Sequence, residues 1–337
     1  MTESRRHYEI GIGLAGSLSP KDYGQLAARA EEAGFDAVTV FGDLMYQPPG
    51  MVLASMAADT SVVRLGVAAY TPWTQHPVEI AGQIAMLDAL SGGRAFYGLV
   101  RGAWMDRLNI DQKHALAAIE DTVAIVKAVL RGEGEGHTGR VYSLAPGTRP
   151  FYDVVRSEVP LLIGSWSPRL AAVAGRIADE LQAGGSANPH MIPRLRELAD
   201  QKPGTTPIRL SLNAITVVDD DRDAARSAAR TAAAPYFDVI AAHDPTVELD
   251  PALLDRVRTA CRRGEHESAG RLIPDDVLDK FAFSGTPDDV AEHAASIIRA
   301  GAYRVEFDTP FGLNTTDGLR VLCDRVLPKV HARLAES

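Results

Sequence analysis

The stretch formed by residues 63–102 constrains the fold more than any other part of this chain of 337 residues. A short apolar run that begins at Val63 predicts a strand buried on both faces. A helix is predicted from Pro77, because proline favours the first helical position, and Ser-Gly-Gly-Arg at 91–94 ends it. A second apolar strand follows at 95–100. The stretch therefore predicts a parallel strand–helix–strand unit, with any site beyond the carboxyl ends of its strands.

The same alternation of apolar strands and amphipathic helices continues along the chain. Strands are predicted at 8–14, 37–41, 63–67, 95–100, 160–164, 180–183, 208–218 and 303–307. Residues 232–283 break this rhythm with mostly helical, polar-rich sequence, which predicts a helical insertion. We therefore expect an α/β fold, a (β/α)8 TIM barrel that forms one domain over residues 1–337 and carries this insertion.

Several element boundaries are predicted from capping residues. Ser19 followed by Pro20 predicts the start of the first helix, and Gly34 predicts its end. Residues 137–151 predict an exposed hairpin, and residues 310–312 predict a turn after the last strand.

The composition argues against several classes of partner. A net charge of -9 without a basic stripe argues against nucleic acid. No apolar run approaches the ~20 residues of a membrane span, and the first residues lack the apolar core of a signal peptide. Cys261 and Cys323 supply neither a disulfide framework nor metal-ligand spacing, so we expect a soluble cytoplasmic protein. The acidic run at 219–221 predicts a helix start, and no metal is expected.

Two motifs carry a resemblance to a known family. The sequence VRLGVAAYTPWTQHP at 63–77, followed by LDALSGGRAFYGLVRG at 87–102, resembles the bacterial luciferase-like oxidoreductase superfamily. Within it, the sequence is most similar to the coenzyme F420-dependent methylenetetrahydromethanopterin reductases. Further similar segments lie at 163–179, 186–189 and 283–290, so the resemblance covers nearly the whole chain.

The resemblance implies a barrel that binds a flavin or the deazaflavin coenzyme F420 at the carboxyl ends of its strands. The cofactor ring would lie against a bulge in the third strand, at a non-prolyl cis peptide that maps onto Ala68–Ala69, with Ala69–Tyr70 as the alternative. The cofactor phosphate would lie near helix N-termini, in the loops 164–169 and 183–188. The cofactor-binding residues expected in this way are Ala68, Ala69, Tyr70, Arg101, Gly164, Ser165, Ser167, Arg169, Ala183, Gly184 and Gly185. The two arginines suit anionic groups of the cofactor, surface ion pairs being the alternative.

The sequence departs from the family where the family has polar side chains. The acid of the family's first strand falls on Gly13, and its Asp-His pair after the second strand falls on Gly42-Asp43. The polar run after the fourth strand falls on residues 100–104, which end in Trp104. Asp43 is then the nearest remaining carboxylate on the predicted catalytic face. We expect it to carry the proton that accompanies hydride transfer, a turn-capping role being the alternative.

Aromatic residues follow three of the predicted strand ends. Trp73, Trp104 and Trp166 predict an aromatic wall for a flat cofactor or substrate, with ordinary loop packing as the alternative. His76, where the family also has a histidine, is expected beside the substrate and is placed to brace the bulge.

These observations favour a coenzyme F420-dependent oxidoreductase. It would transfer a hydride between the deazaflavin and an organic substrate other than methylene-tetrahydromethanopterin. One alternative is a luciferase-like monooxygenase that uses FMN and O₂. A second alternative is a barrel without catalytic activity that binds a cofactor or another ligand. The expected partners are a small-molecule substrate and, from the family, a second copy of the chain in a homodimer.

Overall fold

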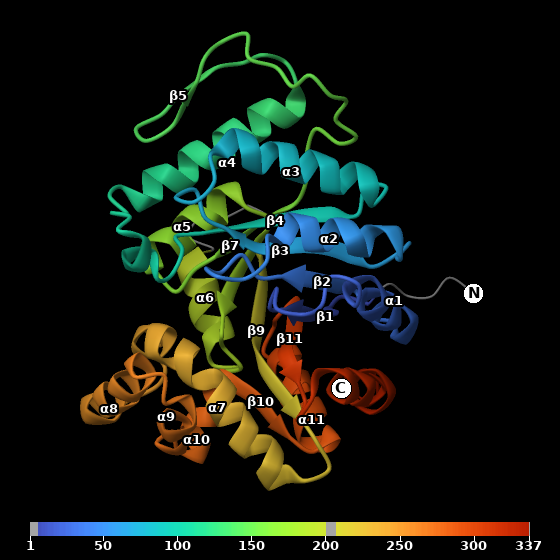
Figure 1. Cartoon of the computed structure of the whole chain (residues 1–337), viewed down its shortest axis with the longest axis vertical. Helices are drawn as coiled ribbons and strands as arrows, with labels where there is room; N and C mark the ends of the chain where they lie inside the picture. The colour runs from blue at the N-terminus through green and yellow to red at the C-terminus, as the bar shows by residue number, and fades with distance from the viewer. Residues whose placement is uncertain (1–5, 200–206, 337) are drawn as a thin grey trace.

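Parallel strands close into a barrel, and helices cover its outer surface (Figure 1). The computed structural model describes residues 6–199 and 207–336, and eight parallel strands within them form the ring. In order around the ring they are β1 (Glu9–Leu14), β2 (Ala37–Val40), β3 (Arg64–Tyr70), β4 (Ala95–Val100), β7 (Leu161–Gly164), β8 (Glu180–Gly184), β9 (Arg209–Val218) and β11 (Arg304–Phe311). The ring closes because β11 pairs with both β9 and β1. The predicted (β/α)8 TIM barrel is confirmed.

The helices outside the barrel bury the outward-facing side chains of the strands. They are α1 (Tyr23–Ala33), α2 (Pro49–Ala58), α3 (Pro77–Leu90), α4 (Ala115–Arg131), α5 (Pro168–Ile177), α6 (Met191–Ala199), α7 (Arg222–Ile240), α11 (Pro287–Arg299), α12 (Thr315–Val321) and α13 (Leu327–Ala335). The π-helical segment Leu322–Val326 joins α12 to α13, and the 3-10 turn η1 (Met105–Leu108) follows β4. The main hydrophobic core lies between this helical layer and the strands.

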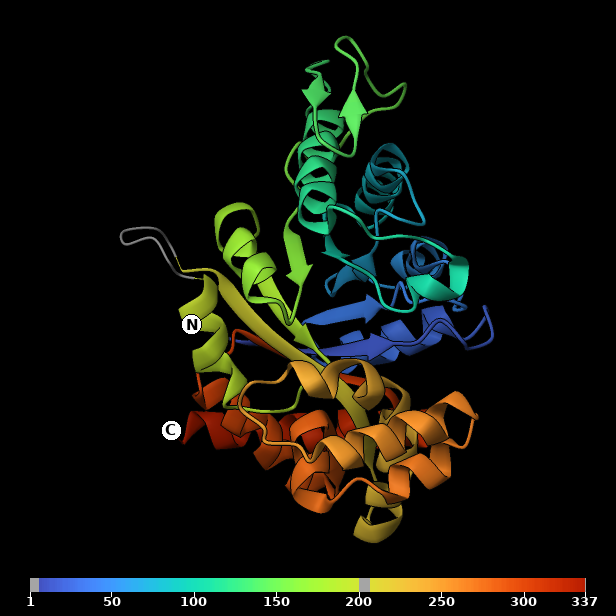
Figure 2. The same cartoon turned by 90° about the vertical axis from the view of Figure 1, so that its left-hand side faces the viewer.

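The predicted insertion contains helices that pack on α7 as a second core. They are α8 (Pro251–Arg262), α9 (His266–Arg271) and α10 (Asp275–Phe281), preceded by the 3-10 turn η2 (Ala241–His243). The boundaries 232 and 283 fall inside regular elements, because α7 begins at Arg222 and β10 (Ala282–Gly285) adds a strand beside β9. The hairpin of β5 (His137–Thr138) and β6 (Ser143–Leu144) lies at the opposite end of the molecule from the insertion, as Figure 2 shows.

Two predicted boundaries are wrong for local reasons. The first helix begins at Tyr23 and not after Ser19, because the Asp22 N–H donates to the Ser19 carbonyl and closes a turn first. Gly34 does end this helix, with φ 94°. The predicted turn at 310–312 is instead the end of β11, where the buried Phe311 pairs with Val217 of β9.

The inside of the barrel holds charged side chains instead of an apolar filling. Arg304 of β11 is fully buried, with Nη2 2.7 Å from Glu180 Oε1 and Nε 3.2 Å from Glu306 Oε1. Glu306 Oε2 also accepts hydrogen bonds from the Thr39 hydroxyl at 3.1 Å and from the Gln182 amide at 3.3 Å. A separate small apolar cluster is formed by Ala37, Phe96 and Leu162. The guanidinium of Arg304 can be fully buried because it is paired with two carboxylates, those of Glu180 and Glu306.

We predict that Arg304→Leu lowers the free energy of unfolding by about 3–5 kcal/mol, because it leaves two carboxylates buried without a counter-charge. Urea denaturation measures the change. The matched control is Arg271→Leu, which removes an exposed arginine paired with Glu267 and is expected to change stability by less than about 0.5 kcal/mol. Equal stability of the two variants would contradict a supporting role for the buried cluster.

Candidate active site

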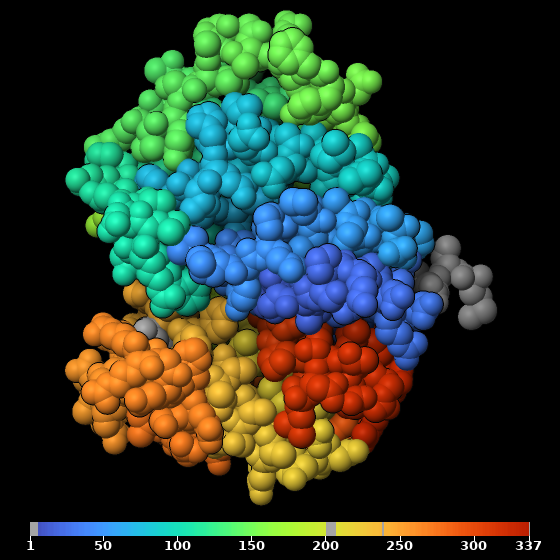
Figure 3. Space-filling view, viewed as in Figure 1, coloured from blue at the N-terminus to red at the C-terminus, as the bar shows by residue number. Residues whose placement is uncertain are grey.

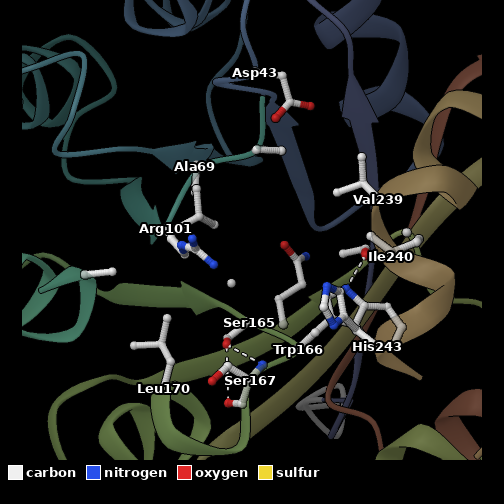
Figure 4. A pocket seen from close by; sticks show the side chains of 18 of the residues that line it. Asp43, Ala69, Arg101, Ser165, Trp166, Ser167, Leu170, Val239, Ile240 and His243 are labelled. Carbon is white, nitrogen blue, oxygen red and sulfur yellow. Dashed lines mark hydrogen bonds between the residues drawn. The ribbon is translucent and has the colours of Figure 1, made fainter. Parts of the chain in front are cut away.

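A cavity of about 930 Å³ opens at the carboxyl ends of the barrel strands. Its mouth lies between the loop after β4 and the helices of the insertion, where the surface in Figure 3 is hollowed. The predicted site residues that line it are Asp43, Ala68, Ala69, Arg101, Trp104, Gly164, Ser165, Trp166, Ser167, Arg169, Gly184 and Gly185. Figure 4 shows Asp43, Ala69 and Arg101 on one side of the cavity and Ser165, Ser167 and Leu170 on the other.

Two of the predicted cofactor residues do not line the cavity, because side chains alternate along a strand. Tyr70 points into the core between β3 and the helices, where its hydroxyl donates to Gln83 Oε1 of α3 at 3.3 Å. Ala183 is fully buried in the same core, between Gln182 and Gly184, which both face the cavity.

Two of the predicted substrate residues also lie away from the cavity lining. The His76 ring caps α3, since its Nδ1 accepts the Val78 N–H at 3.3 Å, and it packs edge-on against Tyr142 at 5.5 Å between centroids. Trp73 lies in the same loop between β3 and α3 and does not line the cavity either. The predicted aromatic wall therefore holds for Trp104 and Trp166 only.

The bulge in β3 forms one wall of the cavity. The peptide bond between Ala68 and Ala69 is cis, so that assignment is confirmed and its alternative is wrong. The pairing of β3 with β4 shifts its register between Val67 and Tyr70, and Ala68 and Ala69 both reach the cavity. Two adjacent alanines leave a flat wall with little side chain, which suits a planar ring.

Asp43 stands directly beside this bulge. A Cβ atom on the preceding residue, Gly42, would lie 2.1 Å from the Ala69 carbonyl oxygen, so only glycine allows this approach. The Asp43 carboxyl is enclosed by protein around the cavity, and this desolvation raises its pKa from 3.8 to about 6. A carboxyl with this pKa exchanges protons readily near neutral pH.

The structure adds polar groups from the barrel interior that sequence reasoning missed. Gln182, Asn213 and Asp308 all line the cavity from below. The Asn213 amide donates to Asp308 Oδ2 at 2.7 Å, and burial together with the charge of Glu306 raises the pKa of Asp308 well above its usual value. One signal was present in the sequence, because β11 alternates charged and apolar residues within a barrel whose strands are buried on both sides.

Tyr236 of α7 is a second residue that sequence reasoning missed. Its hydroxyl lies 3.1 Å from that of Tyr46, and its ring meets Trp104 edge-on with centroids 6.0 Å apart. Burial beside Asp43 raises the pKa of this phenol, so Tyr236 stays neutral. The insertion thereby narrows the cavity with an aromatic wall that replaces the one predicted at Trp73.

Cationic groups and a helix N-terminus line the outer part of the cavity. Arg101, Arg140 and Arg169 all contribute, and Arg140 Nη2 lies 3.3 Å from the His114 ring. The loop before α5 is held by Ser165 Oγ, which accepts the Ser167 N–H at 2.9 Å. This arrangement presents guanidinium groups and backbone N–H groups to an anionic ligand.

The described residues contain neither a cluster of metal-binding side chains nor a helix that could cross a membrane. Over residues 6–199 and 207–336, His, Cys, Asp and Glu side chains form no group of three that could hold a metal ion. Among the helices in the same part of the chain, none combines the length and apolar character needed to cross a membrane.

Comparison with known proteins gives the family. The family model described as luciferase-like monooxygenase matches residues 7–304. The chain belongs to this luciferase-like family. The resemblance read from the sequence motifs is confirmed.

Individual relatives of this luciferase-like chain cover most of its length. The 5,10-methylenetetrahydromethanopterin reductase of Methanolobus tindarius is 24% identical over 309 residues, which are 89% of this chain and 94% of that protein. The F420-dependent glucose-6-phosphate dehydrogenase of Beutenbergia cavernae is 26% identical over an alignment of 338 positions that covers 95% of this chain and 96% of that protein. The solved structure of the coenzyme F420-dependent tetrahydromethanopterin reductase from Methanopyrus kandleri has a TM-score of 0.84 at 23% identity, covering 95% of this chain and 99% of that chain. It shows the same fold.

We predict that Asp43→Asn stabilises the protein near neutral pH. The raised pKa means that the folded protein binds this proton more tightly than the unfolded chain, so ionised Asp43 destabilises the fold above about pH 6. Below about pH 4 both states are protonated and the effect vanishes. Because desolvation raises the pKa of Asp43 from 3.8 to about 6 and its side chain is partly open to the cavity, the gain is about 1–3 kcal/mol.

Thermal unfolding near neutral pH and below about pH 4 measures this gain, with the exposed Asp153→Asn as control. A stabilisation that is the same at both pH values would show that Asp43 is not a desolvated acid.

Proposed function

We propose that this protein is a coenzyme F420-dependent oxidoreductase that transfers a hydride between the deazaflavin and a small organic substrate other than methylene-tetrahydromethanopterin. One observation carries the proposal. The flat wall at Ala68–Ala69 and the desolvated carboxyl of Asp43 face one cavity, in a chain whose relatives include F420-dependent reductases and dehydrogenases. An apolar wall beside a titratable acid suits hydride transfer, which needs a dry ring face and a proton.

The residues present fit this cofactor. Bound F420 would supply or take up the hydride at C5 of its deazaflavin. The Ala68–Ala69 wall would support the ring, while Arg101, Arg169 and the N-terminus of α5 would bind its anionic tail. Arg101 and Arg169 are exposed and Ala69 is buried, and all three line the cavity, so one elongated molecule could contact both groups.

The side chains around Asp43 limit the substrate. Trp104 and Tyr236 meet edge-on and narrow this side of the cavity, which disfavours a large pterin beside Asp43. The resemblance places the substrate-polarising acid of the methylene reductases at Gly13, which has no side chain here. Both features support a smaller substrate, with Asp43 exchanging the proton.

An FMN-dependent monooxygenase is the second candidate, favoured by the family's own description. An FMN phosphate would use the same groups, Arg101, Arg169 and the N-terminus of α5. The anion site therefore does not distinguish binding of FMN from binding of F420. A barrel without catalytic activity is less well supported, because a desolvated carboxyl is costly to keep and this cavity keeps two.

The oligomer and location expected from the sequence remain part of this proposal. Met51 of α2 and Met86 and Leu90 of the adjacent α3 are exposed apolar side chains, which supports a homodimer through these helices. Cys261 and Cys323 are not joined by a disulfide, which supports a cytoplasmic location.

We predict that the purified protein binds F420 more tightly than FMN when the two are titrated separately and followed by absorbance and fluorescence. Arg169→Ala is expected to weaken F420 binding by about 1–3 kcal/mol, because it removes a charge-assisted contact. Arg194→Ala on α6 is the control, since Arg194 pairs with Glu197 on the surface and does not line the cavity. Tighter binding of FMN would favour the monooxygenase.

We predict that Asp43→Asn leaves F420 affinity nearly unchanged and lowers turnover by about 10²–10⁴-fold. In the direction that reduces the substrate, Asp43 must be protonated, so kcat of the wild type falls as pH rises through about 6. In the reverse direction Asp43 acts as a base, and kcat rises over the same range. The variant loses this inflection, and full activity of the variant would remove Asp43 from the mechanism.

A further inference from the structure

A second carboxyl group, that of Asp308, lies in the same cavity and has one oxygen without a partner. Asp308 is 4% exposed, and its Oδ2 accepts the hydrogen bond from Asn213. Its Oδ1 is buried and makes no hydrogen bond to any described residue. A buried polar atom without a partner is costly, so it is expected where a ligand or a function uses it.

Room for this oxygen is made by Gly13 of the neighbouring strand β1. The two residues are register partners, and a Cβ atom at position 13 would lie 2.2 Å from Asp308 Oδ1. No side chain at position 13 can coexist with this placement of the carboxyl. The volume that a side chain of β1 would enter is therefore filled by an acid that projects from β11.

The surroundings of Asp308 favour its neutral, protonated form. Glu306 lies two residues before it on the same strand, Asp43 faces it from the loop after β2, and Tyr236 faces it from α7 as a neutral phenol. The nearby cation, Arg304, is paired with Glu180 and Glu306. Burial and the charges of Glu306 and Asp43 raise the pKa of Asp308 well above its usual value.

The hydrogen bond from Asn213 decides which oxygen carries the proton. Because the amide donates to Oδ2, this oxygen is the acceptor, and the proton of the neutral acid belongs on Oδ1. The unpartnered atom is thus a buried hydrogen-bond donor on a side chain that lines the same cavity as Asp43.

We infer that neutral Asp308 donates a hydrogen bond from Oδ1 to the carbonyl or imine heteroatom of the substrate, while Asp43 supplies the proton. The inference rests on the proposed function and names its substrate class. A hydride added at the carbon breaks the π bond, its electron pair moves to the oxygen or nitrogen, and the proton from Asp43 gives the alcohol or amine. The Oδ1–H group of Asp308 stabilises the charge that develops on the heteroatom and keeps its own proton.

The first test needs no cofactor. Infrared spectra of the protein at about pH 8 are expected to contain the carbonyl band of a protonated carboxylic acid that Asp308→Asn removes. Asp153→Asn, which changes an exposed acid that does not line the cavity, is the control and must leave this band in place. If no band disappears in Asp308→Asn, Asp308 is ionised and the inference is overturned.

The second test measures turnover and cofactor affinity separately. Asp308→Leu removes the donor and is expected to lower kcat about 10²–10³-fold with F420 affinity retained, and Asp308→Asn restores part of the loss through its amide N–H. Should Asp308→Leu fold poorly, the double variant Gly13→Asp/Asp308→Gly returns a carboxyl from β1 to the same volume and is expected to recover activity over the single variant Asp308→Gly.

Full turnover of Asp308→Leu would overturn the role of Asp308, whatever the cofactor. Failure of the wild type to bind F420 would overturn the proposed function, and the infrared result would still decide whether Asp308 is a neutral donor.

Discussion

The buried ion cluster around Arg304 is the interaction on which the rest of this barrel depends. A fully buried guanidinium is stable here only because Glu180 and Glu306 both pair with it. These contacts fix which side of β11 faces inward, since a shift by one residue would turn Val305 and Phe307 into the barrel and the charges into the apolar layer under the helices. The inward position of Asp308, two residues farther along, follows from the same alternation.

The cavity then holds two carboxyl groups in different environments. Asp43 lies at the bulge, partly open to the cavity, and desolvation alone raises its pKa to about 6. Asp308 lies deeper, beside Glu306, and burial together with the charge of Glu306 raises its pKa well above the usual value. Two acids in such different environments can have different roles, one exchanging a proton and the other staying neutral.

The insertion completes the site from a distance along the chain. Tyr236 of α7 approaches Tyr46 after β2 and Trp104 after β4, so three separate segments meet at one wall. Such contacts depend on how α7 packs on β9 and β10, and they leave no pattern in the local sequence.

The sequence by itself determined the alternation of strands and helices, and hence the barrel, because hydrophobic periodicity and caps are local. It also located the bulge at Ala68–Ala69 and the carboxyl of Asp43, since both lie within motifs that resemble a family. Only the tertiary structure decided that Trp73 and His76 lie outside the cavity, because loop side chains are oriented by packing and not by their position after a strand. The tertiary structure alone also placed Asp308 in the space beside Gly13. This placement depends on the register between β1 and β11, two strands that are almost 300 residues apart in the chain.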